Sequence, residues 1–528
     1  MEQLKAFSNR RLEGVLLISA ALVAGLIGIA ITRVNQDRDI FIVVALLLGG
    51  VLLPILVMLA YSKPAFLWWG AIVCLAFWTS EPINPQVRAG LAENPDFNLF
   101  GRYVADMIST WDVLIVVLLV FVFFRSGLQN RNADLVRRVW ANSSVRFYAG
   151  LLLTAILVGC VVILISQSHV FVFRDWVRGV MPIFYFLSAY FLAVNLIRML
   201  GDFRRTWWLL QTVAFLMVLY GLYRLQGILS GQIKTLWPFG IPIVLYSELI
   251  VFYPPILVYF LTLWTRGRLN LLQWFLLLAM IVYILVSTRR FNYINLALYS
   301  GIAFVLGYKT GLFSVRRALV RSWSLLVMAL GAGIVSLQLV PDLLPAVMQS
   351  IETILFFTGK GFEYTGQFRL GEISGIFSNL THLPFTWLTG YGVGSKWRVF
   401  TDLSWGSDPT GGNMAFDAKI MANYAGWLPF FHVPYFATLF RFGLLGTLGL
   451  IAVVWSLLRG YGRMIRTVAD KGDKIILIAL LALIPDPILF LGDSPVPSRY
   501  IWLAIYLGLL ESYRLTRVSP SKILRVST

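Results

Sequence analysis

Long runs of apolar residues recur along the whole chain, and they constrain the fold more than any other feature of the sequence. A helix needs about 20 apolar residues to cross the hydrocarbon core of a bilayer, and such runs extend from residue 14 to residue 513. The hydrophobic fraction is 59% and charged residues make up only 13%. A soluble core of this length cannot hide so much apolar surface from water. The sequence therefore predicts an all-α integral membrane protein.

About fourteen such runs, interrupted by one long connection, divide the chain into three parts. Residues 1–340 hold eleven predicted spans, residues 341–432 form the long connection, and residues 433–528 hold three spans and a short tail. The first run is long and lacks a small-residue cleavage pattern, so we interpret it as an anchor rather than a signal peptide. The predicted spans are 14–32, 40–61, 65–80, 110–124, 147–167, 179–197, 207–229, 239–264, 270–287, 291–307, 322–340, 433–458, 475–492 and 500–513.

The distribution of Lys and Arg predicts how these spans are oriented. If the N-terminus is cytoplasmic, the even-numbered connections and both termini lie inside. They hold the majority of the 44 Lys and Arg residues, although the outer connections are longer in total. Cytoplasmic loops of membrane proteins carry an excess of these residues. We therefore expect both termini inside, and we interpret the net charge of +19 as topological rather than as a sign of nucleic-acid binding.

The connection at 341–432 is far longer than a turn between two helices, and it faces outward in this topology. Connections of this length without structure of their own are uncommon unless they are functional. Two stretches, 343–357 and 368–380, place apolar residues at helical spacing on one side. We expect two short amphipathic helices there, which either lie on the membrane surface or cap a cavity.

The sequence lacks most catalytic signatures of soluble enzymes. It contains no Walker loop, no HExxH, no CxxC pair and no G-x-S-x-G. Its two cysteines, Cys74 and Cys160, fall inside apolar runs, where cysteine behaves as a small packed hydrophobic residue. We predict neither a metal ion nor a cofactor.

Arginine occurs on the predicted outer side, where the orientation rule disfavours it. Arg289 and Arg290 lie in one short outer connection, Arg174 and Arg178 lie at the mouth of a span, and Arg369 lies in the long connection. Each alone is explained by snorkelling to lipid phosphate or by a local ion pair. Together they are what binding a diphosphate at the outer leaflet requires, because guanidinium groups hold phosphate oxygens bidentately and keep their charge.

Histidine supplies a candidate base. His432 opens the span that follows the long connection, and a neutral imidazole at such a mouth can take a proton near neutral pH. The alternative is a polar anchor at the membrane interface. We expect His169 and His382 to be ordinary surface residues.

Three charged residues fall inside predicted spans at similar depth: Glu248, Arg441 and Asp486. Charges at such depth face a cavity or a partner, because burying them alone in lipid is unfavourable. Our hypothesis is that Arg441 pairs with Glu248 or with Asp486, the latter presented by the helix break Pro485-Asp486-Pro487. Such a pair either lies beneath a catalytic cavity or fixes the register of the helices.

Three stretches of the chain carry a resemblance to a known family. Ser-Thr-Arg-Arg at 287–290 ends a predicted helix, Arg369 precedes Gly-Tyr-Gly-Val-Gly at 390–394, and His432 is followed by Tyr435 and by Gly-Leu-Leu-Gly at 443–446. In these features residues 280–450 resemble the O-antigen polymerase and O-antigen ligase family, polytopic glycosyltransferases of the bacterial inner membrane. The chain departs from the family pattern at Val433, where the family often has Asn, and at Arg441, where it often has an acidic residue.

The resemblance implies a GT-C-like architecture and transfer of a glycan from a polyprenyl-diphosphate donor to a hydroxyl of a glycan or lipid-linked acceptor. The reaction takes place at the periplasmic face without a metal, and the product is O-antigen or another exopolysaccharide. The five outer arginines fit binding of the departing diphosphate, and His432 fits the role of base for the acceptor hydroxyl. Besides membrane lipids, the resemblance leaves room for partner proteins of polysaccharide assembly.

Three alternatives to polymerisation of lipid-linked repeat units remain open at this point. A ligase of the same family transfers the finished glycan to lipid A core or to a protein with the same donor chemistry. A transporter or flippase of a lipid-linked or anionic solute also uses outward arginines and intramembrane charge, although the paired repeats common in transporters are not evident here. For cell-wall polymerases of the shape-and-division type, we find no matching acidic residue on the outer loop.

Overall fold

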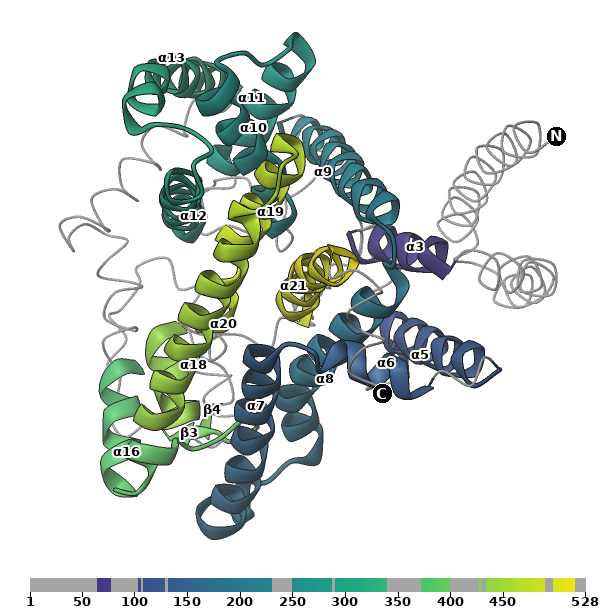
Figure 1. The fold of residues 1–528 in the computed structure, drawn as a ribbon. Helices are drawn as coiled ribbons and strands as arrows, with labels where there is room; N and C mark the ends of the chain where they lie inside the picture. The colour runs from purple at the N-terminus through teal and green to yellow at the C-terminus, as the bar shows by residue number, and fades with distance from the viewer. Residues whose placement is uncertain are drawn as a thin grey trace, which may run out of the picture.

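The computed structural model describes residues 64–76, 103–105, 108–128, 132–229, 249–286, 290–339, 372–398, 427–428, 434–489 and 497–517. Within these ranges the chain is almost entirely helical (Figure 1), as the apolar runs predict. Two short antiparallel sheets are the exceptions. In one, β1 (Tyr103–Ala105) pairs with β2 (Ile108–Ser109), and in the other β3 (Trp397–Arg398) pairs with β4 (Trp427–Leu428).

Each predicted span between residues 65 and 513 corresponds to helix over at least part of its length. The span predicted at 475–492 is divided into α19 and α20 at the predicted helix break Pro485-Asp486-Pro487, because Pro485 and Pro487 cannot continue the hydrogen-bond ladder of α19. The spans predicted at 14–32 and 40–61 lie outside the described residues. The helices are α3 (Pro64–Ala76), α5 (Thr110–Leu128), α6 (Asn132–Val139), α7 (Ser143–Val162), α8 (Phe173–Leu196), α9 (Leu200–Leu229), α10 (Tyr253–Arg266), α11 (Leu271–Val286), α12 (Arg290–Lys309), α13 (Val315–Leu339), a helix over residues 372–382, α16 (Thr386–Thr389), α18 (Pro434–Arg466), α19 (Lys471–Ala482), α20 (Pro485–Leu489) and α21 (Pro497–Arg517).

Among the described residues, four helical stretches are long and apolar enough to cross a membrane: Ser143–Val170, Asp175–Leu196, Val315–Val335 and Tyr435–Arg466. Large apolar side chains of α13, such as Leu319, Trp323 and Leu330, are exposed. Extensive apolar surface on a folded protein indicates contact with a membrane or a partner. The described residues have the character of an all-α membrane protein, whereas the fourteen-helix count, the orientation and the GT-C-like architecture stay predictions.

Helix α21 forms the centre of the bundle and packs along α8 (Figure 1). Trp502 and Tyr506 of α21 are fully buried. Gly508 allows the close approach, because a Cβ atom at this position would lie 2.4 Å from the Cβ atom of Ala193 on α8. Small residues at helix contacts of this kind let two backbones approach each other within a membrane.

The start of α7, the end of α18 and the end of α21 are joined by a polar cluster around Glu511, whose side chain is fully buried. Tyr461 donates a hydrogen bond to the Glu511 carboxylate at 2.8 Å, and Asn142, the N-cap of α7, donates to it at 3.3 Å. Arg514 forms an ion pair with the same carboxylate. A buried carboxylate needs such partners, so this cluster fixes how the three helices meet.

Candidate functional site

A glycine-rich segment of the long outer connection is inserted between helices α7, α8 and α18. Its backbone N–H groups donate to helix carbonyls: Tyr391 to Phe440 at 2.6 Å, Gly392 to Arg441 at 2.9 Å, and Val393 to Ala155 at 2.8 Å. We call residues 390–394 the glycine loop. Its N–H groups are therefore used to attach the loop to α7 and α18.

Helix α18 can accept these bonds because it is interrupted. Gly443 has φ 63° and ψ −173°, which ends the regular ladder within the helix and makes carbonyls of the preceding turn available. The carbonyls of Phe440 and Arg441 lie in that turn and accept from the loop. The stretch Gly443-Leu-Leu-Gly446, which carries part of the family resemblance, thus contains the break that receives the glycine loop.

Glycine is required on both sides of this contact. Gly390, Gly392 and Gly394 have φ values of +75°, +75° and +88°, which side chains disfavour. A Cβ atom at Gly392 would lie 2.0 Å from the backbone N of Gly159, and one at Gly159 would lie 2.2 Å from the Val393 carbonyl oxygen. The backbones of the loop and of α7 therefore touch directly, with no room for a side chain between them.

Two side chains, one after the end of α7 and one at the start of α8, bind the segment that follows the glycine loop. We call these contacts the anchor. Gln167, in the π-helical turn Ile163–Gln167 after α7, donates to the Lys396 carbonyl at 2.8 Å and accepts from its N–H at 3.0 Å. The Lys396 ammonium forms an ion pair with Asp175 at 2.7 Å, and both side chains are largely buried. Asp175 lies in the first turn of α8, where a carboxylate also interacts favourably with the helix dipole.

The helix over residues 372–382 packs beside this anchor. Ile376 and Leu380 are fully buried in a cluster that includes Ala437 and Phe440 of α18. Phe377 packs edge-to-face against Phe436 of α18, with ring centroids 5.7 Å apart. The amphipathic helix predicted for residues 368–380 is present, but its apolar face is buried against the helix bundle. The stretch 343–357 lies outside the described residues.

The structure places only part of the predicted diphosphate site. Arg174 and Arg178 lie in the first two turns of α8, and Arg290 begins α12. The glycine loop lies against the same two turns of α8, since a Cβ atom at Gly394 would lie 2.6 Å from the Trp176 ring and one at Gly179 would lie 2.9 Å from the Gly394 Cα atom. The side chains of the three arginines are not among the described parts, and Glu248, Arg289, Arg369 and His432 lie outside the described residues.

Two of the three charges predicted inside spans, Arg441 and Asp486, lie on α18 and α20, which pack against each other. Thr438 of α18 donates to the Leu489 carbonyl at the end of α20, at 2.7 Å. Arg441 follows Thr438 by three residues on α18, and Asp486 precedes Leu489 by three residues on α20. Both side chains are buried. Pairing of Arg441 with Asp486 or Glu248 stays a prediction.

The sequence did not indicate that Tyr299 is a hydrogen-bond partner of Asp486. The Tyr299 hydroxyl on α12 donates a hydrogen bond to the Asp486 carboxylate, and Tyr299 is 1% exposed. A tyrosine hydroxyl inside the apolar span 291–307 indicates that a polar partner is needed. The sequence of the span does not show which helix supplies that partner.

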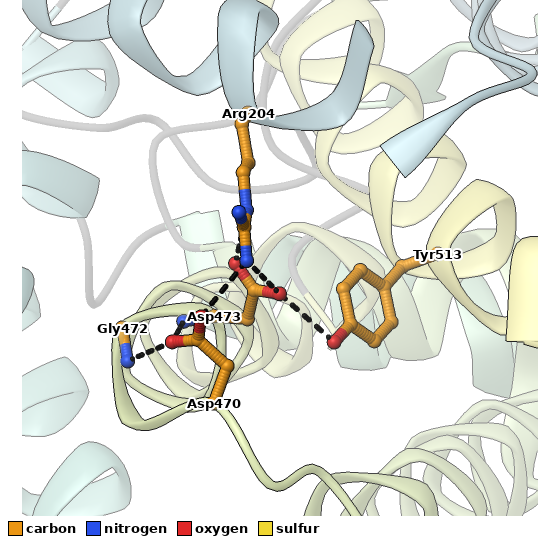
Figure 2. A network of polar contacts seen from close by, with 5 residues as sticks. All are labelled: Arg204, Asp470, Gly472, Asp473 and Tyr513. Carbon is orange, nitrogen blue, oxygen red and sulfur yellow. Dashed lines mark hydrogen bonds and ion pairs between the residues drawn. The ribbon is translucent and has the colours of Figure 1, made fainter. Parts of the chain in front are cut away.

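A second polar network, which the sequence did not indicate, joins the start of α9, the start of α19 and the end of α21 (Figure 2). Arg204 donates to both oxygens of Asp473 at 2.9 and 3.1 Å and to Asp470 at 2.8 Å. Tyr513 donates to Asp473 at 3.1 Å. Asp470 is the N-cap of α19, where its carboxylate accepts from the N–H of Gly472 at 2.7 Å. Both carboxylates are engaged by protein donors, so we assign this network a structural role.

The Asp470 cap supplies a prediction for stability and its pH dependence. The pKa of Asp470 lies below its ordinary value, and the largest cause is the hydrogen bond that its carboxylate accepts from the Asp473 N–H. A lowered folded pKa means that the stabilisation is present above about pH 4 and is lost as the pH falls further. Asp470→Ala is expected to destabilise the protein by about 1 kcal/mol at pH 7, seen as a lower thermal midpoint in detergent. The difference should shrink below pH 4.

Asp470→Asn is the matched control, because its amide oxygen can still accept from the N–H groups of α19. The thermal midpoint of Asp470→Asn should lie closer to that of the wild-type protein than the midpoint of Asp470→Ala does. Equal midpoints for all three proteins at pH 7 would contradict the capping role.

The fold and the site together indicate a helical membrane protein in which part of the long connection 341–432, the glycine loop, is attached to the helix bundle through backbone contacts. Within the described ranges, no group of three or more His, Cys, Asp or Glu side chains is placed to hold a metal ion. No protein-family model, curated protein or solved structure matches the chain.

Proposed function

We propose that the chain is a glycosyltransferase of the bacterial inner membrane that polymerises polyprenyl-diphosphate-linked repeat units at the periplasmic face. The proposal comes from the resemblance of residues 280–450 to the O-antigen polymerase and ligase family. The observation that carries it further is the insertion of the glycine loop between α7, α8 and α18. The insertion brings the starts of α8 and α18 together, and the helix over residues 372–382 packs beside them. The sequence predicts candidate site residues in or next to all three segments.

The first two segments are the starts of α8 and α18. Arg174 and Arg178 lie on the turns of α8 that contact Gly394. The loop residue Gly392 bonds to the Arg441 carbonyl on α18, and α18 begins at Pro434, two residues after His432. Since consecutive residues span at most about 3.6 Å each, His432 is tethered within about 7 Å of the start of α18.

The third segment is the helix over residues 372–382, which begins three residues after Arg369. The same limit tethers Arg369 within about 11 Å of that helix. The helix packs on the first turn of α18 through Phe377 and Phe436. An arginine of the diphosphate site and the candidate base therefore precede two helices that are in direct contact.

The proposed reaction is a displacement at the anomeric carbon of the donor glycan. The acceptor hydroxyl forms the new glycosidic bond, its proton passes to the His432 imidazole, and the bond to the diphosphate breaks so that polyprenyl diphosphate leaves with the electron pair. Arginine guanidinium groups stabilise the charge that develops on the leaving group, and they do so most strongly in a mouth of low dielectric constant.

The test is to delete the gene and to extract the lipid-linked glycans of the deletion strain. Accumulation of single repeat units is the expected result, because the donor would be made and exported but not extended. Accumulation of long lipid-linked chains would replace the polymerase assignment with that of a ligase, and an unchanged glycan profile would contradict both. Return of the wild-type profile on a plasmid copy of the gene is the control.

A further inference from the structure

The carboxylate of Asp486 joins α20 to α12, and α20 also packs against α18 and α21. Asp486 is buried in the first turn of α20 and accepts the hydrogen bond of Tyr299 from α12. A buried carboxylate holds its hydrogen-bond donor in place, because withdrawing the donor leaves a charge poorly solvated.

On one side, this junction is connected to α18. The hydrogen bond from Thr438 to the Leu489 carbonyl fixes α20 against α18. Pro485 and Pro487 flank Asp486, and their fixed backbone angles restrict the turn that carries its carboxylate. The position of Asp486 is therefore fixed relative to the start of α18.

On the other side, the junction is connected to α12. This helix begins at Arg290, directly after the Ser-Thr-Arg stretch that resembles the family motif. Tyr299 lies nine residues further on, which corresponds to about 13 Å along the helix axis. Since an α-helix is stiff over two or three turns, holding Tyr299 in place also restricts the position of the Arg290 end.

We propose that the hydrogen bond between Tyr299 and Asp486 is a positioning contact that sets the distance between the arginine end of α12 and the histidine end of α18. The inference rests on the proposed function, because it assigns the pair to the geometry of glycan transfer. Tyr299 and Asp486 touch neither donor nor acceptor in this proposal. They act by keeping the diphosphate arginines and His432 at a productive separation.

The activity test compares Tyr299→Phe with Tyr308→Phe in proteoliposomes supplied with lipid-linked repeat units. Tyr308 is an exposed residue on the same helix and serves as the matched control. Loss of the Tyr299 hydroxyl is expected to lower kcat by 10- to 100-fold with little change in KM for the donor, because a displacement near 1 Å between reacting groups reduces the rate on that scale. Asp486→Asn, which still accepts a hydrogen bond, should keep more activity than Asp486→Ala.

A distance measurement tests the same contact without relying on enzymatic activity. Spin labels are placed at Ile294→Cys on α12 and Tyr435→Cys in the first turn of α18, both exposed positions, in a protein whose Cys74 and Cys160 are replaced by serine. Pulsed electron resonance should give one narrow distance distribution with Tyr299 present and a broader or shifted one in Tyr299→Phe. The Tyr308→Phe protein should match the parent.

These two measurements separate the possible failures. Unchanged distances together with unchanged kcat in Tyr299→Phe would overturn the positioning role. If the wild-type protein forms no polymer, the proposed function fails and the distance measurement alone decides whether the contact sets the helix separation. If Tyr299→Phe is recovered in low yield, Asp486→Ala, which removes the acceptor of the same hydrogen bond, carries the same comparison, with Asp486→Asn as its control.

Discussion

His432→Ala is expected to lower polymer formation by about 10²- to 10⁴-fold, the range that a general base contributes to a transfer reaction. In the proposed mechanism the imidazole takes the proton of the acceptor hydroxyl as the new bond forms, and alanine offers no replacement. The measurement is the chain-length profile of extracted glycan in a deletion strain that carries the variant on a plasmid. Membrane insertion, followed by the amount of protein in the membrane fraction, should be unchanged.

Arg369→Ala is expected to have an effect of similar size, about 10²- to 10³-fold, because removing one donor to a developing oxyanion has consequences on that scale. Two matched controls are available: His382, exposed on the helix over residues 372–382, and Arg316, exposed at the start of α13. His382→Ala and Arg316→Ala should give normal polymer. Wild-type product from both His432→Ala and Arg369→Ala would rule out the mechanism.

Gly159→Ala is also expected to have a large effect, because it acts on the contact that holds the glycine loop. The added methyl group would lie 2.2 Å from the carbonyl oxygen of Val393. The clash is with backbone, which cannot move aside as a flexible side chain would. We expect destabilisation of at least about 1–3 kcal/mol, the usual result of overpacking, together with faster proteolysis of the outer connection and loss of polymer.

Gly150→Ala is a matched control on the same helix α7, because a Cβ atom there meets nothing within 4 Å. Alanine is favoured over glycine inside a helix by about 1 kcal/mol, so this variant should be as stable as the parent or slightly more stable. If Gly159→Ala and Gly150→Ala show the same thermal midpoint and the same proteolysis pattern, the glycine loop is not held as the structure shows.

The positions of the helices were largely predictable, because the signal for a helix in a membrane protein lies in its own residues. Runs at 147–167, 179–197, 322–340 and 433–458 fall within or overlap the four long apolar helical stretches. The amphipathic pattern at 368–380 also identified the residues that become buried, Ile376 and Leu380. What that pattern did not show was whether its apolar side faces lipid or protein, since both are apolar environments.

The contacts at the candidate site were much less predictable. The insertion of the glycine loop is made by backbone atoms of residues 390–394, and hydrogen bonds between backbones leave no trace in side-chain chemistry. The anchor of Gln167 and Asp175 to Lys396 joins residues more than 200 positions apart, and no periodicity relates such residues. Tyr299 was overlooked for the same reason, because a tyrosine in an apolar helix gives no sign of the carboxylate it meets.

The sequence alone determined the class of the protein, because hydrophobic burial depends on residue composition and spacing along each helix. It also singled out Asp486 and Arg441 as charges that need an explanation, since burying a charge is unfavourable in any fold. Only the tertiary structure decided that the glycine loop is inserted into the bundle and that Asp486 accepts the hydrogen bond of Tyr299. Those contacts depend on the distance and direction between helices, which are set by the packing of the whole bundle rather than by any one segment.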